Sequence, residues 1–236
     1  MSLPAHFTPI KICGLTREQD VDAAVQAGVQ AIGFVLYEPS PRCVNVARAA
    51  ELARRLPAFV NPVLLTVNAS EATLEAACAE VPGAWLQFHG DENPAFCQRV
   101  GQRLGRRWLR AARIPLDHDA PAFDLIKYAS DYQHAHALLL DAHVEGYGGG
   151  GKAFNWSRLP TSVNAHLVLS GGLTPANVTD GILQVRPRCQ TLAVDVSSGV
   201  EVSKGIKSAE KIHQFVAAVR AADEQLAKRH AQLPTA

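Results

Sequence analysis

Residues 10–28, IKICGLTREQDVDAAVQAG, contain one complete strand, turn and helix. The short run Ile10–Cys13 reads as a strand, and the glycine that follows it marks a turn. Thr16, with Gln19 three residues later, has the pattern of a helix start, and Gly28 stands where such a helix would end. A strand that passes directly into a helix indicates an α/β fold.

The same succession recurs along the whole chain. Most of the apolar runs are continuous rather than alternating, which is typical of parallel strands covered on both faces. Asn45, Asn93-Pro94, Thr174-Pro175 and Ser208 are expected to begin further helices. The eight expected strands are Ile10–Cys13, Ala31–Leu36, Val63–Val67, Trp85–His89, Trp108–Ala112, Ala137–Asp141, His166–Ser170 and Leu192–Val196.

Eight such units in 236 residues predict a single-domain (β/α)8 TIM barrel. A doubly wound open sheet has the same alternation and remains the alternative. One domain is expected to span residues 1–236, with a short N-terminal extension at 1–8 and a frayed tail from about 230 to 236. Between the sixth and seventh strands only about one helical turn is expected, near Trp156.

The composition narrows the class of protein. With 47% hydrophobic residues the chain can bury a large core, and its 23 basic and 22 acidic residues nearly cancel. We therefore expect neither nucleic acid nor a membrane surface as a partner. The chain lacks the pattern of a secretory signal, and its five cysteines are odd in number without a CxxC pair. These features predict a cytoplasmic protein with free thiols.

Two residues at strand ends are candidates for acid–base chemistry, because ligands of βα folds bind at the carboxyl ends of the strands. Cys13 ends the first strand, where Lys11 and a following helix N-terminus would favour its thiolate. Asp141 follows three leucines at the end of the sixth strand, where apolar surroundings would favour a protonated carboxyl and a general acid. The alternatives are a buried structural cysteine and an aspartate that caps a helix or forms a salt bridge.

Two late turns have the composition of an anion site. The segments Ser170-Gly171-Gly172 and Ser197-Ser198-Gly199 offer backbone N–H groups and hydroxyls after strands seven and eight, where barrels often hold phosphate. Arg42 could bind a carboxylate through its guanidinium, and His89 could hydrogen-bond a substrate. The glycine-rich segment Gly146–Lys152 is interpreted as a lid.

These turns, taken in order, resemble those of the phosphoribosylanthranilate isomerase family. The resemblance extends from about Ile10 to Val219 and includes nearly every expected active-end loop. The motifs that carry it are Lys11–Thr16, Gly33-Phe34 with Ser40-Pro41-Arg42, Gln87–Asp91, Leu140–Ala142, Ser170–Pro175 with Asn177-Val178, and Val194–Glu201.

The resemblance implies an Amadori rearrangement of a phosphorylated ribosyl anthranilate without metal or cofactor. It implies that Asp141 is the general acid and Cys13 the base, with Arg42 holding the anthranilate carboxylate. His89 would lie near the aromatic ring, and Asp195 would bond the opened sugar. The implied phosphate ligands are Gly171, Gly172, Ser197, Ser198 and Gly199.

Some positions depart from the family pattern. The glycines after Asp141 replace a common Gly-Thr-Gly, and Arg110 stands where a lysine is frequent. Other sugar-phosphate barrels fit less well, since a bifunctional relative would have a carboxylate in place of Cys13. A barrel that only binds phosphate remains an alternative, although binding alone requires neither Cys13 nor Asp141. A monomer is expected.

Overall fold

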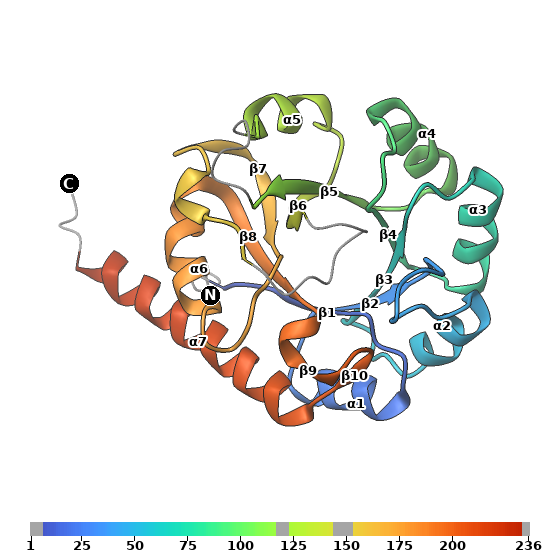
Figure 1. Cartoon of the computed structure of the whole chain (residues 1–236), viewed down its shortest axis with the longest axis horizontal. Helices are drawn as coiled ribbons and strands as arrows, with labels where there is room; N and C mark the ends of the chain where they lie inside the picture. Colours follow the sequence, from blue (N-terminus) through green and yellow to red (C-terminus); the bar gives the residue numbers. More distant parts are fainter. Residues whose placement is uncertain (1–6, 117–122, 144–152, 233–236) are drawn as a thin grey trace.

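The computed structural model describes residues 7–116, 123–143 and 153–232. Eight parallel strands form a closed barrel in sequence order, surrounded by helices (Figure 1). The open-sheet alternative is wrong, because β1 pairs with both β2 and β8. The strands are β1 (Ile10–Cys13), β2 (Ala31–Val35), β3 (Asn61–Thr66), β4 (Trp85–Phe88), β5 (Trp108–Pro115), β6 (Ala137–His143), β7 (Val163–Leu169) and β8 (Cys189–Val196).

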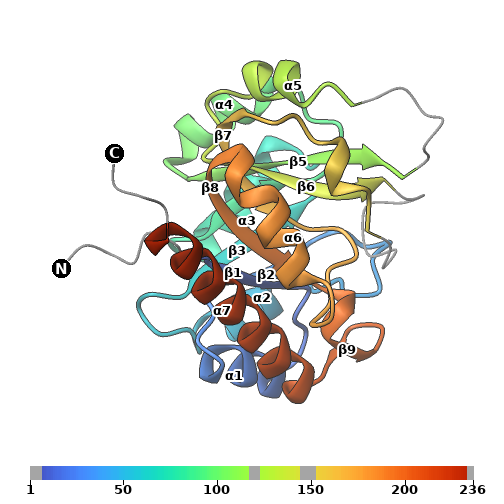
Figure 2. The same ribbon diagram turned by 90° about the vertical axis from the view of Figure 1, so that its left-hand side faces the viewer.

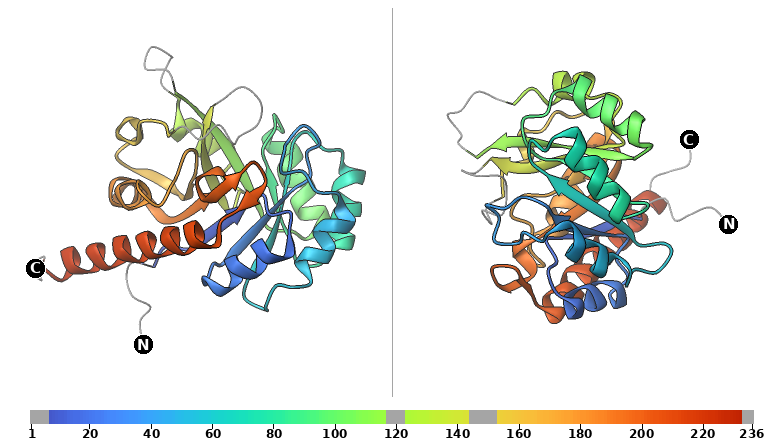
Figure 3. Two further views of the ribbon diagram at one scale, coloured as in Figure 1. Left: turned by 60° about the horizontal axis from the view of Figure 1, so that its bottom comes forward. Right: turned by 90° about the vertical axis from the view of Figure 1, so that its right-hand side faces the viewer.

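Seven α-helices are described between and after these strands, and the last of them packs against α1 and α6 (Figures 2 and 3). They are α1 (Glu18–Gln26), α2 (Val46–Ala53), α3 (Glu71–Glu80), α4 (Pro94–Leu104), α5 (Leu125–Asp131), α6 (Val178–Val185) and α7 (Ala209–Ala231). Three short 3-10 turns are η1 (Trp156–Arg158), η2 (Arg186–Arg188) and η3 (Ser198–Val200). A hairpin of β9 (Glu201–Ser203) and β10 (Ile206–Lys207) follows η3.

Several helix starts agree with the capping patterns in the sequence. The side chains of Asn45, Asn93 and Ser208 each accept a backbone N–H from the first turn of the next helix. The single turn η1 at Trp156 is also confirmed. These starts are predictable because the capping bond is local, between a side chain and the residue three positions further on.

Two helix starts were predicted wrongly. Thr16 does not cap α1, which begins after Arg17; its hydroxyl donates to the Gly205 carbonyl at 2.9 Å. The helix expected at Thr174-Pro175 begins only at Val178, and the Asn177 side chain braces the preceding loop. At Thr16 a tertiary contact takes the hydroxyl that the local pattern assigns to a cap, and at Thr174 the backbone N–H bonds Asn177 in a loop that delays the helix start.

The barrel wall separates two kinds of packing. Outward-facing residues such as Ile12, Phe34 and Leu140 are fully covered by the helices and form the main core. Two small clusters fill the interior of the barrel: Cys13, Val35 and Leu65, and Ala111, Leu139 and Val168. The interior therefore holds the strand-end side chains among short apolar ones.

The N-terminal end of the described chain contacts the outer helix α7, which forms its C-terminal end. The backbone N–H and the hydroxyl of Thr8 donate to Asp223 at 3.1 and 2.6 Å. The helix α7 itself continues to Ala231, so the expected frayed tail falls mainly on residues 233–236, outside the described residues. In the parts of the chain that the structure describes, no helix combines the length and apolar character needed to cross a bilayer.

Candidate active site

The strand register brings the polar residues of β1 together with those of its neighbours. Lys11 lies opposite Asp195 of β8, and Cys13 lies opposite Gly33 of β2. The Lys11 ammonium is 2.8 Å from Asp195 Oδ1, and Asp195 Oδ2 accepts the Ser170 hydroxyl at 3.0 Å. Both oxygens of this carboxylate are thus engaged inside the barrel mouth.

Cys13 is 4% exposed, and its thiol lies beside Lys11. Burial raises the pKa of the Cys13 thiol above its ordinary value, although the Lys11 charge opposes this effect. The expectation that a helix N-terminus would also favour the Cys13 thiolate is wrong, because α1 begins five positions later at Glu18. Lys11 keeps its charge, since Asp195 raises its pKa to about 12 against the effect of burial. A fixed cation therefore counteracts the desolvation of Cys13.

Asp141 lies on another part of the wall and contacts His89 of the β4 end. His89 Nε2 is 3.1 Å from Asp141 Oδ2, and His89 Nδ1 is 2.9 Å from the amide nitrogen of Gln87. Asp141 Oδ1 accepts the N–H of Ala142 at 2.9 Å. The three side chains of this hydrogen-bonded series, Gln87, His89 and Asp141, are all buried.

This arrangement can hold a proton in two ways. When the Gln87 amide donates to Nδ1, His89 Nε2 carries a hydrogen and donates to the Asp141 carboxylate. The other Gln87 amide atom, Oε1, is buried without a hydrogen-bond partner. A half-turn of the amide would let Oε1 accept from Nδ1, so that Nε2 would accept a proton from Asp141. A residue that can hold and release one proton is what a general acid requires.

The two loops expected to bind an anion lie against one another. Gly171 and Gly172 both have left-handed backbone, with φ of 73° and 68°, which glycine adopts without strain. Gly199 packs so closely on the Leu173 carbonyl that a side chain there would collide with it. Ser197 and Ser198 stand at the start of η3 on the same side of the barrel. The structure thus brings the five predicted phosphate ligands into one region.

Arg42 is held by a partner that the sequence analysis did not assign. Its Nε and Nη2 donate to the two carboxylate oxygens of Glu201, at 2.7 and 2.8 Å. Lys207 of β10 donates to the same carboxylate at 2.8 Å. The Nε–Nη2 edge expected to fork a substrate carboxylate is therefore occupied by Glu201, and Nη1 is the remaining terminal nitrogen.

Four residues of the site had no assigned role in the sequence analysis. Glu201, Gln87 and Gly33 occur in the quoted motifs. The partners of Glu201 and Gly33, Arg42 and Cys13, are distant in sequence, whereas Gln87 contacts His89 two positions further on. Gly33 has a clear signal, a glycine inside an apolar strand, and a Cβ there would lie 2.8 Å from the Cys13 sulfur. Lys207 had no signal at all, because only the folded hairpin brings it beside the mouth.

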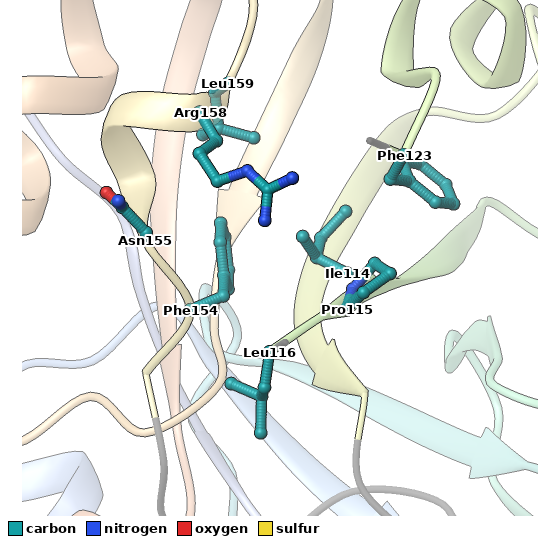
Figure 4. Close-up of a pocket in the computed structure, with 8 residues that line it drawn as sticks. All are labelled: Ile114, Pro115, Leu116, Phe123, Phe154, Asn155, Arg158 and Leu159. Carbon is teal, nitrogen blue, oxygen red and sulfur yellow. The ribbon is translucent and has the colours of Figure 1, made fainter. Parts of the chain in front are cut away.

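Two hollows lie away from these residues. One of about 940 Å³ is at the amino ends of the strands, lined in part by Gln30, Asn61 and Ala193, and contains none of the predicted site residues. The other is a smaller pocket between the end of β5 and η1, where Figure 4 shows Arg158 reaching between Phe154 and Phe123. The acid–base candidates belong to neither.

Two further expectations concern metals and the lid. Within the three described ranges, no group of three or more His, Cys, Asp or Glu side chains could hold a metal ion. The predicted lid Gly146–Lys152 lies outside the described residues.

Comparison with known proteins identifies the family to which this site belongs. A family model described as N-(5'phosphoribosyl)anthranilate (PRA) isomerase matches residues 10–218. The chain belongs to this family. A relative from Methylibium petroleiphilum, named N-(5'-phosphoribosyl)anthranilate isomerase, is 61% identical over 220 residues, covering 93% of this chain and 97% of the relative.

Solved structures of the isomerase family have the same fold. The phosphoribosyl anthranilate isomerase of Thermus thermophilus superposes with a TM-score of 0.76 at 30% identity, covering 91% of this chain and 99% of that one. Another isomerase was solved with reduced 1-(o-carboxyphenylamino)-1-deoxyribulose 5-phosphate; it has a TM-score of 0.73 at 30% identity, covering 91% of this chain and 100% of that one. The resemblance inferred from the sequence is confirmed: the chain is a TIM-barrel isomerase of tryptophan biosynthesis.

Proposed function

We propose that this isomerase converts N-(5-phosphoribosyl)anthranilate into 1-(o-carboxyphenylamino)-1-deoxyribulose 5-phosphate, with Asp141 as the acid and Cys13 as the base. The observation that carries the assignment is the placement of the two groups. Both are buried at the carboxyl ends of strands, Cys13 on β1 and Asp141 on β6, and these strands stand three places apart in the closed barrel, on different sides of the mouth. One substrate could contact both.

The first step is ring opening. Asp141 gives a proton to the furanose ring oxygen while the bond from that oxygen to carbon 1 breaks, and the anthranilate nitrogen forms a double bond to carbon 1. His89, bonded to Asp141, can return a proton to the carboxylate afterwards. The opened sugar carries free hydroxyls, for which Asp195 is the nearby acceptor in the mouth.

The second step is proton transfer at the sugar carbons. The Cys13 thiolate removes the proton from carbon 2, the released electron pair forms a double bond to carbon 1, and the nitrogen regains its lone pair. The resulting enolamine becomes the ketone when carbon 1 takes up a proton and the hydroxyl at carbon 2 loses one. Lys11, fixed beside Cys13, stabilises the thiolate that this step consumes.

The remaining assignments concern binding. Gly171, Gly172, Ser197, Ser198 and Gly199 would bind the phosphate through backbone N–H groups and hydroxyls. Arg42 would hold the anthranilate carboxylate through its Nη1 side. His89 would lie near the aromatic ring.

We also propose that the chain is one domain and acts as a cytoplasmic monomer. The exposed large hydrophobic residues among those described are scattered over different segments: Phe7, Phe59, Ile126 and Val202. Single exposed apolar residues are normal on a monomer. Light scattering during gel filtration checks this, and a molar mass near 51 kDa in place of the 25.3 kDa of one chain would contradict it.

The experiment that tests the proposed reaction uses the purified wild-type chain. Substrate is generated with magnesium from anthranilate and phosphoribosyl pyrophosphate by a phosphoribosyltransferase, and excess EDTA is then added together with the isomerase. We expect product to form at a rate proportional to the amount of isomerase added. No turnover by folded protein would contradict the substrate assignment.

A further inference from the structure

Arg42, Glu201 and Lys207 form a buried cluster beside the mouth of the barrel. The Arg42–Glu201 pair has side chains only 8% and 5% exposed, and Lys207 has none of its side chain exposed. The Glu201 carboxylate accepts from Nε and Nη2 of Arg42 and from Nζ of Lys207, at 2.7, 2.8 and 2.8 Å. This bidentate geometry is the strongest form of such a pair.

The charges of the cluster do not cancel. Two cations share one carboxylate. Burial by itself would raise the pKa of Glu201, but the charges and hydrogen bonds of Arg42 and Lys207 outweigh this effect. The pKa of Glu201 therefore lies below its ordinary value. Glu201 is therefore ionised at neutral pH, and Arg42 remains charged. Burial lowers the pKa of Lys207, but the Glu201 charge opposes this effect. With all three groups charged, the cluster carries one excess positive charge beside the mouth of the barrel.

Arg42 is fixed on several sides. Besides Glu201, its backbone N–H donates to the Ser40 hydroxyl at 3.2 Å. Its aliphatic part packs against Gly14, where an added Cβ would lie 2.6 Å from Arg42 Cδ. The guanidinium therefore has one edge committed to Glu201 and presents Nη1 as its remaining terminal nitrogen.

Lys207 connects this cluster to the loop assigned to phosphate. Its ammonium lies 3.1 Å from the carbonyl and 3.3 Å from the hydroxyl of Ser197. The Ser197 hydroxyl in turn donates to the carbonyl of Cys13 at 3.0 Å. One lysine thus contacts both the partner of Arg42 and the first residue of the phosphate loop.

We propose that Glu201 and Lys207 are positioning residues. Glu201 orients Arg42 toward the aromatic carboxylate of the substrate, and Lys207 fixes the Arg42–Glu201 pair relative to the phosphate loop. The β9–β10 hairpin then sets the separation between the two anion sites. This inference rests on the proposed function and adds a determinant of specificity, namely that a substrate must carry a carboxylate and a phosphate at that separation.

The test compares Glu201→Gln, Lys207→Met and wild type in calorimetric titrations with anthranilate and with inorganic phosphate. For Glu201→Gln we expect the dissociation constant of anthranilate to rise about tenfold or more, because Arg42 loses a charged bidentate partner, while phosphate binding stays unchanged. Lys207→Met should weaken both ligands. In turnover, Glu201→Gln should raise KM far more than it lowers kcat.

A matched control comes from the surface of the same chain. Arg55 and Asp22 form an equally bidentate pair, at 2.8 and 2.6 Å, but both side chains are about two-fifths exposed. Asp22→Asn should alter neither ligand, since exposed pairs contribute little. If Glu201→Gln does not fold, Glu201→Asp retains the charge and shortens the side chain, and it should weaken anthranilate selectively.

The outcomes separate this inference from the proposed function. Anthranilate that binds Glu201→Gln as well as wild type, or more tightly, would overturn the positioning role and make Glu201 a competitor for Arg42. Equal losses of both ligands in Glu201→Gln would also overturn it, as a general structural effect. These titrations need no turnover, so a failure of the isomerase assay is recognised independently.

Discussion

The two walls of the barrel mouth are stabilised by different kinds of interaction. On the side of β1 and β8, charged groups surround Cys13: Lys11 pairs with Asp195, and Lys207 of β10 also acts on the thiol. On the side of β4 and β6, Asp141 contacts a histidine, which in turn contacts an amide. Both walls are buried, but the neighbours of Cys13 are charged groups, whereas the neighbours of Asp141 are a histidine and, behind it, an amide.

This difference matches the two chemical roles that we propose for Cys13 and Asp141. A buried thiolate needs a permanent positive charge nearby, because desolvation alone favours the neutral thiol. An acid must instead be able to lose and regain a proton, so a neighbour whose own proton can move suits it better than a fixed cation. Asp195, although it also ends a strand, is engaged by Lys11 and is therefore a poor candidate for the acid.

The largest effect is expected from removing either reacting group. Cys13→Ala and Asp141→Asn should each lower kcat by about 10²–10⁴-fold, the usual contribution of a positioned acid or base. The check is steady-state kinetics, with circular dichroism to show that each variant is folded. Near-normal turnover in a folded variant would remove that residue from the mechanism.

A smaller effect is expected from Lys11→Met, which removes the cation beside Cys13. Since the Lys11 charge lowers the pKa of the thiol, its loss should raise that pKa further and shift the pH dependence of Cys13 alkylation by iodoacetamide to higher pH. At neutral pH the alkylation rate should fall about tenfold.

Two control variants are needed to interpret the Lys11→Met experiment. Cys13→Ala gives the background reaction of the other four cysteines. Lys11→Met with Asp195→Asn avoids an unpaired buried carboxylate and should recover part of the reactivity, because the Asp195 charge itself opposes thiolate formation. An unchanged profile in the single variant would show that the β1 and β8 wall does not tune the base.

The smallest effect on rate is expected from Gln87→Leu on the opposite wall. Gln87 contacts His89 Nδ1 but not Asp141, so its loss should lower kcat only about threefold, the effect of one lost hydrogen bond on the orientation of the imidazole. The low-pH limb of the kcat profile is the thiol limb, because it reports protonation of the Cys13 thiolate, and it should keep its position in this variant. If the thiol limb moved instead, the division between the two walls would be wrong.

Much of the fold follows from local patterns in the sequence. The first strand was predicted with its observed ends, and Asn45, Asn93 and Ser208 marked true helix starts because each caps a residue three positions away. The late start of α6 was not predictable in this way, since the Asn177 side chain bonds Thr174 and Gly172 in a loop whose shape depends on its neighbours.

The sequence predicted individual candidate residues of the site but not the contacts between them. Position at a strand end was enough to select Cys13 and Asp141 as candidates. The partner of Arg42 lies 159 positions away in sequence, and Lys207 belongs to a hairpin with no pattern of its own. Ion pairs of this kind depend on the closed barrel, which brings β1 and β8 together only after the whole chain has folded.

The division of labour between the walls is tested most directly by a substrate that carries deuterium at carbon 2, made from suitably labelled phosphoribosyl pyrophosphate. Single-turnover rates would be compared for Cys13→Ser and Asp141→Asn. In Cys13→Ser, removal of that hydrogen should limit the rate, and the labelled substrate should react much more slowly. In Asp141→Asn, ring opening should limit the rate, and both substrates should react alike. A large isotope effect in Asp141→Asn and none in Cys13→Ser would contradict the account.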